Sequence, residues 1–207
     1  PILSGEGIED ATVENLVLDG NREANEHLDG NYAGCVFLQD CNRIVLRKVA
    51  ARNYNGDGIS WQICHDVAVE DCTVENNRDL GLHPGSGSQR PVIRGNTLSG
   101  NGIGHRDTDN LIVGNTIVSS QDQGILFRPE RGPDFAGHRN RIENNVLRDN
   151  GSEDGAAIEI QGGTEGIRIV NNEIVETRGP AQRTAIRQGP ETKDIHAEGN
   201  RVSGFAP

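Results

Sequence analysis

Five phrases, Asn96-Thr-Leu98, Asn115-Thr-Ile117, Asn145-Val-Leu147, Asn172-Glu-Ile174 and Asn200-Arg-Val202, repeat one pattern in the second half of the chain. In each phrase an Asn stands two residues before an aliphatic residue. A second pattern, a small residue followed by an aliphatic one, runs out of phase with the first, at Gly58-Ile59, Gly81-Leu82, Gly102-Ile103, Gly124-Ile125, Ala157-Ile158 and Ala185-Ile186. Two short patterns in each period indicate short strands joined by turns, so we interpret the chain as a solenoid.

The length of the period excludes helical repeats. From Val36 the aliphatic pattern recurs at Ile59, Leu82, Ile103, Ile125, Ile158 and Ile186, in steps of 23, 23, 21, 22, 33 and 28 residues. Helical repeats are longer, at roughly 33 to 47 residues. The segments 43–49 and 66–72 alternate apolar and polar residues, as strands do, and clusters of Asn, Asp and Gly between such segments favour turns. The coils are therefore built from strands and turns.

The composition supports a solenoid with a thin core. The 207 residues include 27 Gly, and only 3% of residues are aromatic and 33% hydrophobic. A solenoid tolerates this composition because each coil buries a narrow file of aliphatic residues against its neighbours. We predict an all-β, single-stranded right-handed parallel β-helix of about 7–8 coils, with residues 1–207 as one domain. A buried Asn at the repeated position can bond to the next coil and form a ladder, although turn chemistry alone also favours Asn.

The repeated patterns resemble those of the pectate-lyase-like superfamily of right-handed parallel β-helix proteins, over about Val13 to Val202. The runs Asp57-Gly-Ile-Ser-Trp-Gln, Gly81-Leu-His-Pro-Gly-Ser-Gly-Ser-Gln-Arg-Pro and Gly104-His-Arg-Asp-Thr-Asp-Asn are similar to a subgroup of parallel β-helix repeat proteins without an agreed function. The resemblance implies the fold. It leaves the function open, because this fold hosts lyases, hydrolases, epimerases and phage adhesins.

Aligned strands predict which side chains share an outer face. If the repeated aliphatics point inward, the next residues point outward, because side chains alternate along a strand. This outer row reads Phe37, Ser60, His83, Gly104, Leu126, Glu159, Arg187, and a second row two residues later reads Gln39, Gln62, Gly85, Arg106, Arg128, Gln161, Gly189. Both rows are largely polar. They predict a shallow groove that binds a polysaccharide or oligosaccharide, and we expect such a protein to act outside the cell rather than in the cytoplasm.

One hypothesis for this groove is a polysaccharide lyase or C5-epimerase. Such enzymes need a base for the C5 proton of a uronate and a positive group for its carboxylate. We assign His83 and His105 as candidate bases and Arg128 as the carboxylate anchor, with Arg187 as an alternative anchor. Further candidate substrate-binding residues are Ser60, Gln62, Arg106, Phe135 and His138, the last two from the long segment 128–138.

A second hypothesis is a glycoside hydrolase that uses Asp57 with Asp79 or Glu159. Asp57 and Asp79 lie 22 residues apart, hence on neighbouring coils, and paired carboxylates can act as acid and base in glycoside hydrolysis. The placement resembles the polygalacturonase family, whose motifs are partly matched by Asn55-Gly-Asp57, Asp79 and Gly104-His105. Leu80 and Arg106 depart from that family's pattern. A turn role for Asp57 is an equal alternative.

A third hypothesis is a noncatalytic glycan-binding or structural module. No cofactor is certain, but Asp107 and Asp109 could bind calcium, or could equally cap a corner. The formal net charge of −11 argues against nucleic acid as a partner, since phosphate binding needs clustered basic residues. No apolar run is long enough for a membrane span, so we expect no membrane partner.

Four cysteines lie in the first third of the chain, at positions 35, 41, 64 and 72. Cys41 and Cys64 are 23 residues apart and should stack on adjacent coils, at a separation that permits a disulfide. Free, buried thiols are the alternative that we favour. No CxxC spacing is present, which makes a zinc site improbable.

Two irregularities interrupt the pattern. The step from Asn96 to Asn115 is only 19 residues, against 30, 27 and 28 for the other Asn steps, and we hypothesise that residues are missing near Asn101 and Gly102. The ends also carry no recognisable polar cap. Because open coils expose unpaired strand edges, we expect self-association through the uncapped ends.

Overall fold

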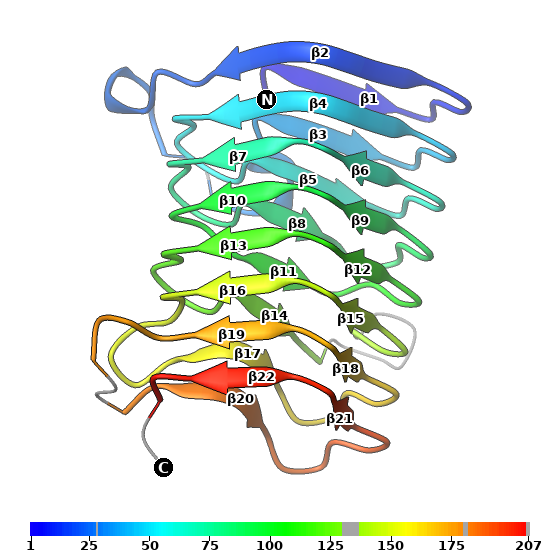
Figure 1. Cartoon of the computed structure of the whole chain (residues 1–207). Helices are drawn as coiled ribbons and strands as arrows, with labels where there is room; N and C mark the ends of the chain where they lie inside the picture. The colour runs from blue at the N-terminus through cyan, green and yellow to red at the C-terminus, as the bar shows by residue number, and fades with distance from the viewer. Residues whose placement is uncertain (28, 130–136, 180–181, 206–207) are drawn as a thin grey trace.

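Each turn of the chain adds one strand to each of three parallel sheets, as the computed structural model shows (Figure 1). The structure describes residues 1–27, 29–129, 137–179 and 182–205. The first sheet contains β1 (Leu3–Glu6), β3 (Val36–Gln39), β5 (Ile59–Gln62), β8 (Leu82–Pro84), β11 (Ile103–His105), β14 (Ile125–Phe127), β17 (Ala156–Ile160) and β20 (Thr184–Gln188), in that order. Its eight strands correspond to eight coils, which confirms the predicted all-β solenoid of about 7–8 coils.

The other two sheets are joined at one end by long strands. The second sheet contains β6 (Ala68–Glu70), β9 (Val92–Arg94), β12 (Leu111–Val113), β15 (Arg141–Glu143), β18 (Arg168–Val170) and β21 (His196–Glu198). The third contains β7 (Thr73–Glu75), β10 (Thr97–Ser99), β13 (Thr116–Val118), β16 (Val146–Arg148), β19 (Glu173–Val175) and β22 (Arg201–Ser203). In the first two coils, β2 (Thr12–Asp19) and β4 (Val45–Arg52) each run through both sheets.

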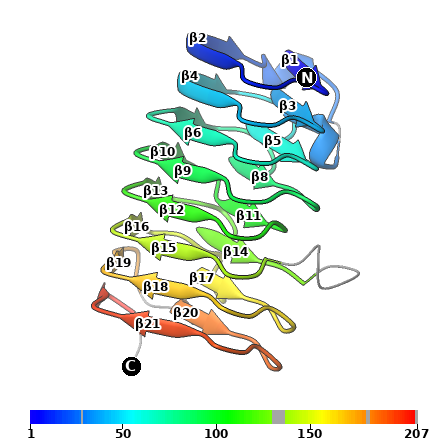
Figure 2. The same ribbon diagram turned by 90° about the vertical axis from the view of Figure 1, so that its right-hand side faces the viewer.

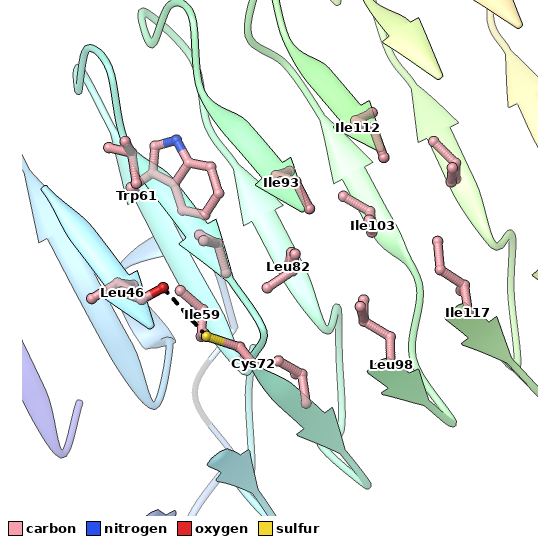
Figure 3. Packing of buried hydrophobic residues seen from close by; sticks show 14 of the residues in the cluster. Leu46, Ile59, Trp61, Cys72, Leu82, Ile93, Leu98, Ile103, Ile112 and Ile117 are labelled. Carbon is pink, nitrogen blue, oxygen red and sulfur yellow. Dashed lines mark hydrogen bonds between the residues drawn. The ribbon is translucent and has the colours of Figure 1, made fainter. Parts of the chain in front are cut away.

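The core is the file of aliphatic residues that the repeat predicts. Val36, Ile59, Leu82, Ile103 and Ile125 pair in register along the first sheet and are completely buried. Figure 3 shows the same stacking in all three sheets, with the indole of Trp61 filling the inside of its coil. Burial of these side chains against the coils on either side is the main stabilising term of the fold.

The repeated Asn residues form the predicted ladder inside the coils. The backbone N–H of Asn96, Asn115, Asn145 and Asn172 each donates to the side-chain oxygen of the next Asn, at 2.9 Å in every case. The side-chain nitrogens also donate to main-chain oxygens of the previous coils, such as Val69 O. The buried amides therefore satisfy the turn backbone that an apolar residue would leave unpaired.

The four cysteines are free and buried. The N–H of Cys41 donates to Sγ of Cys64 at 3.3 Å, so the two residues stack on adjacent coils as predicted, as thiols rather than as a disulfide. Within the described ranges, no helix is long and apolar enough to span a membrane. The helical structure that these ranges contain is two single 3-10 turns, η1 (Arg22–Ala24) and η2 (Asn31–Ala33).

Candidate functional site

The outer row of the first sheet has the predicted register. Along this row Phe37 pairs with Ser60, Ser60 with His83, Gly104 with Leu126, Leu126 with Glu159, and Glu159 with Arg187. The pairing of Ile103 with Leu82 aligns Gly104 with His83 and completes the row. The repeat therefore predicted correctly which residues occupy equivalent positions on neighbouring coils.

Part of this row is covered by the segment between β2 and β3. We call residues 21–33, without residue 28, the strap. Its turn η2 packs against β3 and β5, on the outer side of the sheet (Figure 2). Oγ of Ser60 donates to the main-chain oxygen of Asn31 at 2.5 Å, and the side-chain nitrogen of Asn31 donates to Trp61 O at 3.1 Å. Ser60 is completely buried, so its predicted role as an exposed substrate-binding residue is wrong.

Beside the strap, one corner of the solenoid lacks a loop. Asn77, Asn101 and Ser120 occupy equivalent positions on three successive coils. Three residues, 78–80, separate Asn77 from Gly81, and three residues, 121–123, separate Ser120 from Gly124, whereas Asn101 is followed directly by Gly102. The short coil closes through hydrogen bonds from Gly81 N to Gly102 O (2.8 Å) and from Ile103 N to Gly124 O (2.9 Å).

We call the gap between the two flanking loops the slot. It is bounded by residues 78–80, 100–102 and 121–123 and is part of a pocket of about 440 Å³ that reaches onto the first sheet. This volume lies in the range of sites for small ligands. The other residues around the pocket are Asp29, Gly30 and Asn31 of the strap, His83, Arg106 and Arg128 of the outer rows, and Asp57 and Ser120, which precede strands of the first sheet. The structure shows that the coil closes as it stands; the prediction that residues are missing there stays untested.

A buried histidine and a buried aspartate pair inside this pocket. Nδ1 of His83 lies 2.6 Å from Oδ2 of Asp57, and the two residues are 8% and 3% exposed. Oδ1 of Asp57 accepts the backbone N–H of Leu80 at 2.9 Å, which fixes the carboxylate. When the carboxylate of Asp57 is ionised it can only accept, so Nδ1 is then the donor of this hydrogen bond and Nε2 is left as the second ring nitrogen. Within the described ranges Nε2 makes no hydrogen bond.

A second histidine–aspartate pair holds the strap to the rim of the pocket. Nε2 of His27 lies 3.0 Å from Oδ2 of Asp79, and both side chains are about one-third exposed. The backbone oxygen of Asp79 accepts the side-chain N–H of Asn101 at 2.7 Å. Asp79 thus lies at the rim as predicted, but its carboxylate already has a cationic or hydrogen-bonding partner. His27 was not predicted, because the strap has no repeat from which its position could be inferred.

Three arginines give the pocket its positive groups. Arg106 and Arg128 line it from the second outer row, as predicted, and Arg78 joins them from the wall of the slot. Arg78 also donates to the side-chain oxygen of Asn55 at 3.5 Å. Guanidinium groups can pair with carboxylates in a bidentate manner, and these three lie in a pocket that Asp29, Asp57, Asp79 and Asp122 also line.

His105 does not share the outer face with His83. It lies two residues after the inward-pointing Ile103, and alternation therefore turns its ring into the coil, where it is completely buried and stacks on Phe127 with ring centroids 4.9 Å apart. Nδ1 of His105 lies 3.0 Å from the buried carboxylate of Asp107. The expectation that both histidines line one groove is therefore wrong for His105.

The predicted calcium ligands are also separated. Asp107 faces the interior with His105, while both oxygens of Asp109 accept hydrogen bonds from Arg139, at 2.8 and 3.0 Å. Arg139 holds the pKa of Asp109 below its ordinary value, mainly through these hydrogen bonds. Among the described residues no group of three or more His, Cys, Asp or Glu side chains could hold a metal ion.

Several other predicted residues lie away from the pocket. Glu159 and Arg187 form an ion pair at 3.6 Å farther along the first sheet, and Gln62 donates to the side-chain oxygen of Gln39 at 2.6 Å. His138 is buried, and its Nδ1 accepts the backbone N–H of Glu165 at 3.1 Å, so it stabilises the turn. Phe135 lies outside the described residues.

The family follows from a model match that spans most of the chain. Residues 24–202 match the family model described as right-handed beta helix region. The chain belongs to this right-handed β-helix family. This result also confirms the predicted handedness. A search of curated protein sequences found no match.

Similar solved structures carry the same fold at low identity. A mannuronic acid specific polysaccharide family 6 lyase from the human gut microbiota has 12% identity and a TM-score of 0.64, over 95% of this chain and 52% of that one. The periplasmic alginate epimerase AlgG has 14% identity and a TM-score of 0.61, over 94% and 47%. The A-module of the mannuronan C-5 epimerase AlgE6 of Azotobacter vinelandii has 16% identity and a TM-score of 0.60, over 98% and 76%. The chain thus spans about half of the lyase and of AlgG.

Proposed function

We propose that this protein abstracts the C5 proton of a uronate unit in an acidic polysaccharide, as a lyase or a C5-epimerase. The observation that carries the proposal is the His83–Asp57 pair, buried in a pocket that Arg78, Arg106 and Arg128 also line. The pocket thus combines an oriented base with positive groups. The names of the similar lyase and epimerases support this class of substrate, while their identities of 12–16% establish the fold alone.

The pair gives His83 the properties of a general base. Nε2 of His83 would take the C5 proton, and Asp57 would stabilise the imidazolium that forms while holding the ring in one tautomer. An arginine beside the substrate carboxylate would stabilise the negative charge that develops when C5 loses its proton. In a lyase the electron pair then expels the oxygen at C4, which leaves as a hydroxyl group by taking a proton from the His83 imidazolium or from water. In an epimerase C5 takes a proton from water on its other face, and His83 returns its proton to solvent.

The first test measures proton exchange at C5. Uronate polymers are incubated with the protein in D2O, with and without calcium. Unsaturated products are followed by near-ultraviolet absorbance, and deuterium at C5 by NMR. We expect His83→Gln to lower the rate by about 10²- to 10⁴-fold, the usual contribution of a general base. Asp57→Asn should have a similar effect, because the amide can reverse the tautomer of the histidine.

The control is another histidine–aspartate pair, which lies far from the pocket. Nε2 of His196 lies 2.6 Å from Asp194 at the exposed end of the solenoid. His196→Gln should leave the rate unchanged. Full activity in His83→Gln would contradict the proposed base, whatever the substrate.

A glycoside hydrolase remains the second candidate, because Asp57 and Asp79 line the same pocket. Glu159, the alternative partner of Asp57, lies outside it. Hydrolysis would release reducing ends without unsaturated products, and a noncatalytic glycan-binding module would release neither. The same incubations therefore distinguish the three functions.

A further inference from the structure

The slot is two coil spacings wide along the axis of the solenoid. Adjacent strands of a sheet lie about 4.8 Å apart, so the loops at 78–80 and 121–123, which flank one loopless coil, are separated by about 10 Å between backbones. Both loops line the pocket, with Asp79 and Leu80 in one and Asp122 and Gln123 in the other. The space that a third loop would fill is therefore open and lined largely by polar groups.

The floor of the slot is a stretch of backbone with no side chain of its own in the slot. Gly100 has φ +80°, a conformation that favours glycine, and a Cβ on Gly102 would lie 2.0 Å from the main-chain oxygen of Gln123. Between them, the side chain of Asn101 turns inward to bond to Asn77 O and Asp79 O, both at 2.7 Å. The backbone at the bottom of the slot is thus held by interior hydrogen bonds. The side chain of Leu80 reaches from the wall of the slot to Gly104, where a Cβ would lie 2.6 Å from its Cδ1.

The strap blocks the approach to His83 along the axis of the solenoid over β5. Along the axis of the solenoid, the outer face next to His83 is Ser60, which is completely buried under η2. The side chain of Asn31 also fills the space beside Gly85, where a Cβ would lie 1.9 Å from its Nδ2. A polysaccharide that ran along the axis over β5 would collide with the strap.

We infer that the substrate crosses the solenoid through the slot, with one sugar unit in the space of the absent loop, and does not run along the axis over β5. This inference rests on the proposed function, because it concerns the same pocket. Asp122 would bind the hydroxyl groups of that unit, beside Gln123, whose side-chain N–H donates to Glu159 at 3.1 Å, while the neighbouring unit would reach His83. The short coil is then the feature that opens the site.

The test refills the slot. The tripeptide Gln-Asp-Gln, copied from residues 121–123, is inserted between Asn101 and Gly102, and binding of saturated trisaccharides of galacturonate, mannuronate and guluronate is measured by calorimetry. A second variant, Asp122→Trp, fills the slot from its exposed wall without changing the backbone. Controls are the same insertion between Gly162 and Gly163, and Glu153→Trp at an exposed turn. Circular dichroism confirms that each variant folds.

We expect both slot variants to bind the trisaccharide at least tenfold more weakly than the unmodified protein and the controls. If a folded slot variant binds and reacts like the unmodified protein, the inference is wrong and the proposed function stands. If the slot variants lose binding but no C5 exchange occurs in any protein, the slot is the binding site and the proposed chemistry is wrong. If no trisaccharide binds the unmodified protein, the slot inference and the proposed function are both overturned.

Discussion

A single buried asparagine connects three coils. The backbone N–H and Nδ2 of Asn145 both donate to Oδ1 of Asn172, at 2.9 and 3.0 Å, and Nδ2 also donates to Ile112 O at 2.9 Å. Its own Oδ1 accepts the backbone and side-chain N–H groups of Asn115, at 2.9 and 3.0 Å. Loss of this amide would leave several buried donors and acceptors unpaired.

We therefore expect Asn145→Ala to lower the free energy of unfolding by about 2–5 kcal/mol, since each buried unpaired group costs about 1–3 kcal/mol. Urea denaturation measures the change. Asn200 stands at the end of the ladder and is only half-buried, so Asn200→Ala should cost about 1 kcal/mol. Equal losses of unfolding free energy in the two variants would show that burial does not strengthen the hydrogen bonds of the ladder.

Burial also determines the reactivity of the thiols. It raises the pKa of Cys35 and of Cys64 to about 12, and it raises the pKa of Cys72 as well. Since the thiolate is the reactive form, a disulfide reagent such as DTNB should label none of the four cysteines in the native protein. In denaturant without a reductant it should label all four. Fewer than four labelled thiols would reveal a disulfide.

Among the structural elements, one corner carries alternating charges. Asp10, Arg43, Asp66, Arg90, Asp109 and Arg139 occupy this corner on successive coils, all at positive φ. Arg43 bonds to Asp10 at 2.7 Å, Arg90 to Asp66 at 2.8 Å and Arg139 to Asp109 at 2.8 Å. The charges thus form three ion pairs along the outside of the solenoid.

These pairs predict a loss of stability in acid. Hydrogen bonds from Arg90 and Arg139 hold the pKa values of Asp66 and Asp109 below their ordinary values. A carboxyl whose pKa is lower in the folded state stabilises the fold above its unfolded pKa, near 3.9, and this contribution disappears as the pH falls through the folded pKa. Because the Asp66 and Asp109 pairs are largely exposed, each of these two should contribute less than about 1 kcal/mol.

The measurement is the melting temperature between pH 6 and pH 2 at low ionic strength. We expect the variant Arg90→Gln/Arg139→Gln to lose less stability over this range than the unmodified protein. High salt should reduce the difference by screening. An unchanged pH profile in the variant would show that the corner pairs do not affect acid stability.

The strands were predictable from sequence because the repeat specifies both period and register. Alternation from Ile59 and Leu82 placed Ser60 and His83 on one face, and the structure pairs them. The same alternation places His105 inside, because it lies two residues after the inward-pointing Ile103. A position on the coil next to His83 does not by itself put a residue on the same face. The strap and the slot were not predictable, because they depend on segments that interrupt the repeat.

At the scale of the whole molecule, the end coils expose what the other coils bury. Val17 is 62% exposed and Ile2 49% exposed in the first coil, and Val202 is 50% exposed in the last. β1 and β2 pair with another strand on one edge only. Apolar residues beside an open strand edge favour association with another copy.

This 207-residue chain should therefore self-associate reversibly. Sedimentation velocity over a range of concentrations measures this, and Val17→Lys should weaken the association, because an edge lysine opposes pairing. Ile63→Lys is the matched control, since Ile63 is 50% exposed on the side of an inner coil. A monomer at every concentration would contradict the prediction that the open ends associate.

The loopless corner shows how a solenoid can acquire a new site. Although the coil between Leu82 and Ile103 is short, Ile103 still pairs with both Leu82 and Ile125, so the corner length varies without disturbing the neighbouring strands. An in-frame deletion of a few codons at one corner can therefore create a hollow in one mutational step. The reverse insertion can erase it, and moving the deletion by one repeat would move the hollow by one strand spacing. In this architecture, loop length can evolve separately from the sequence of the core.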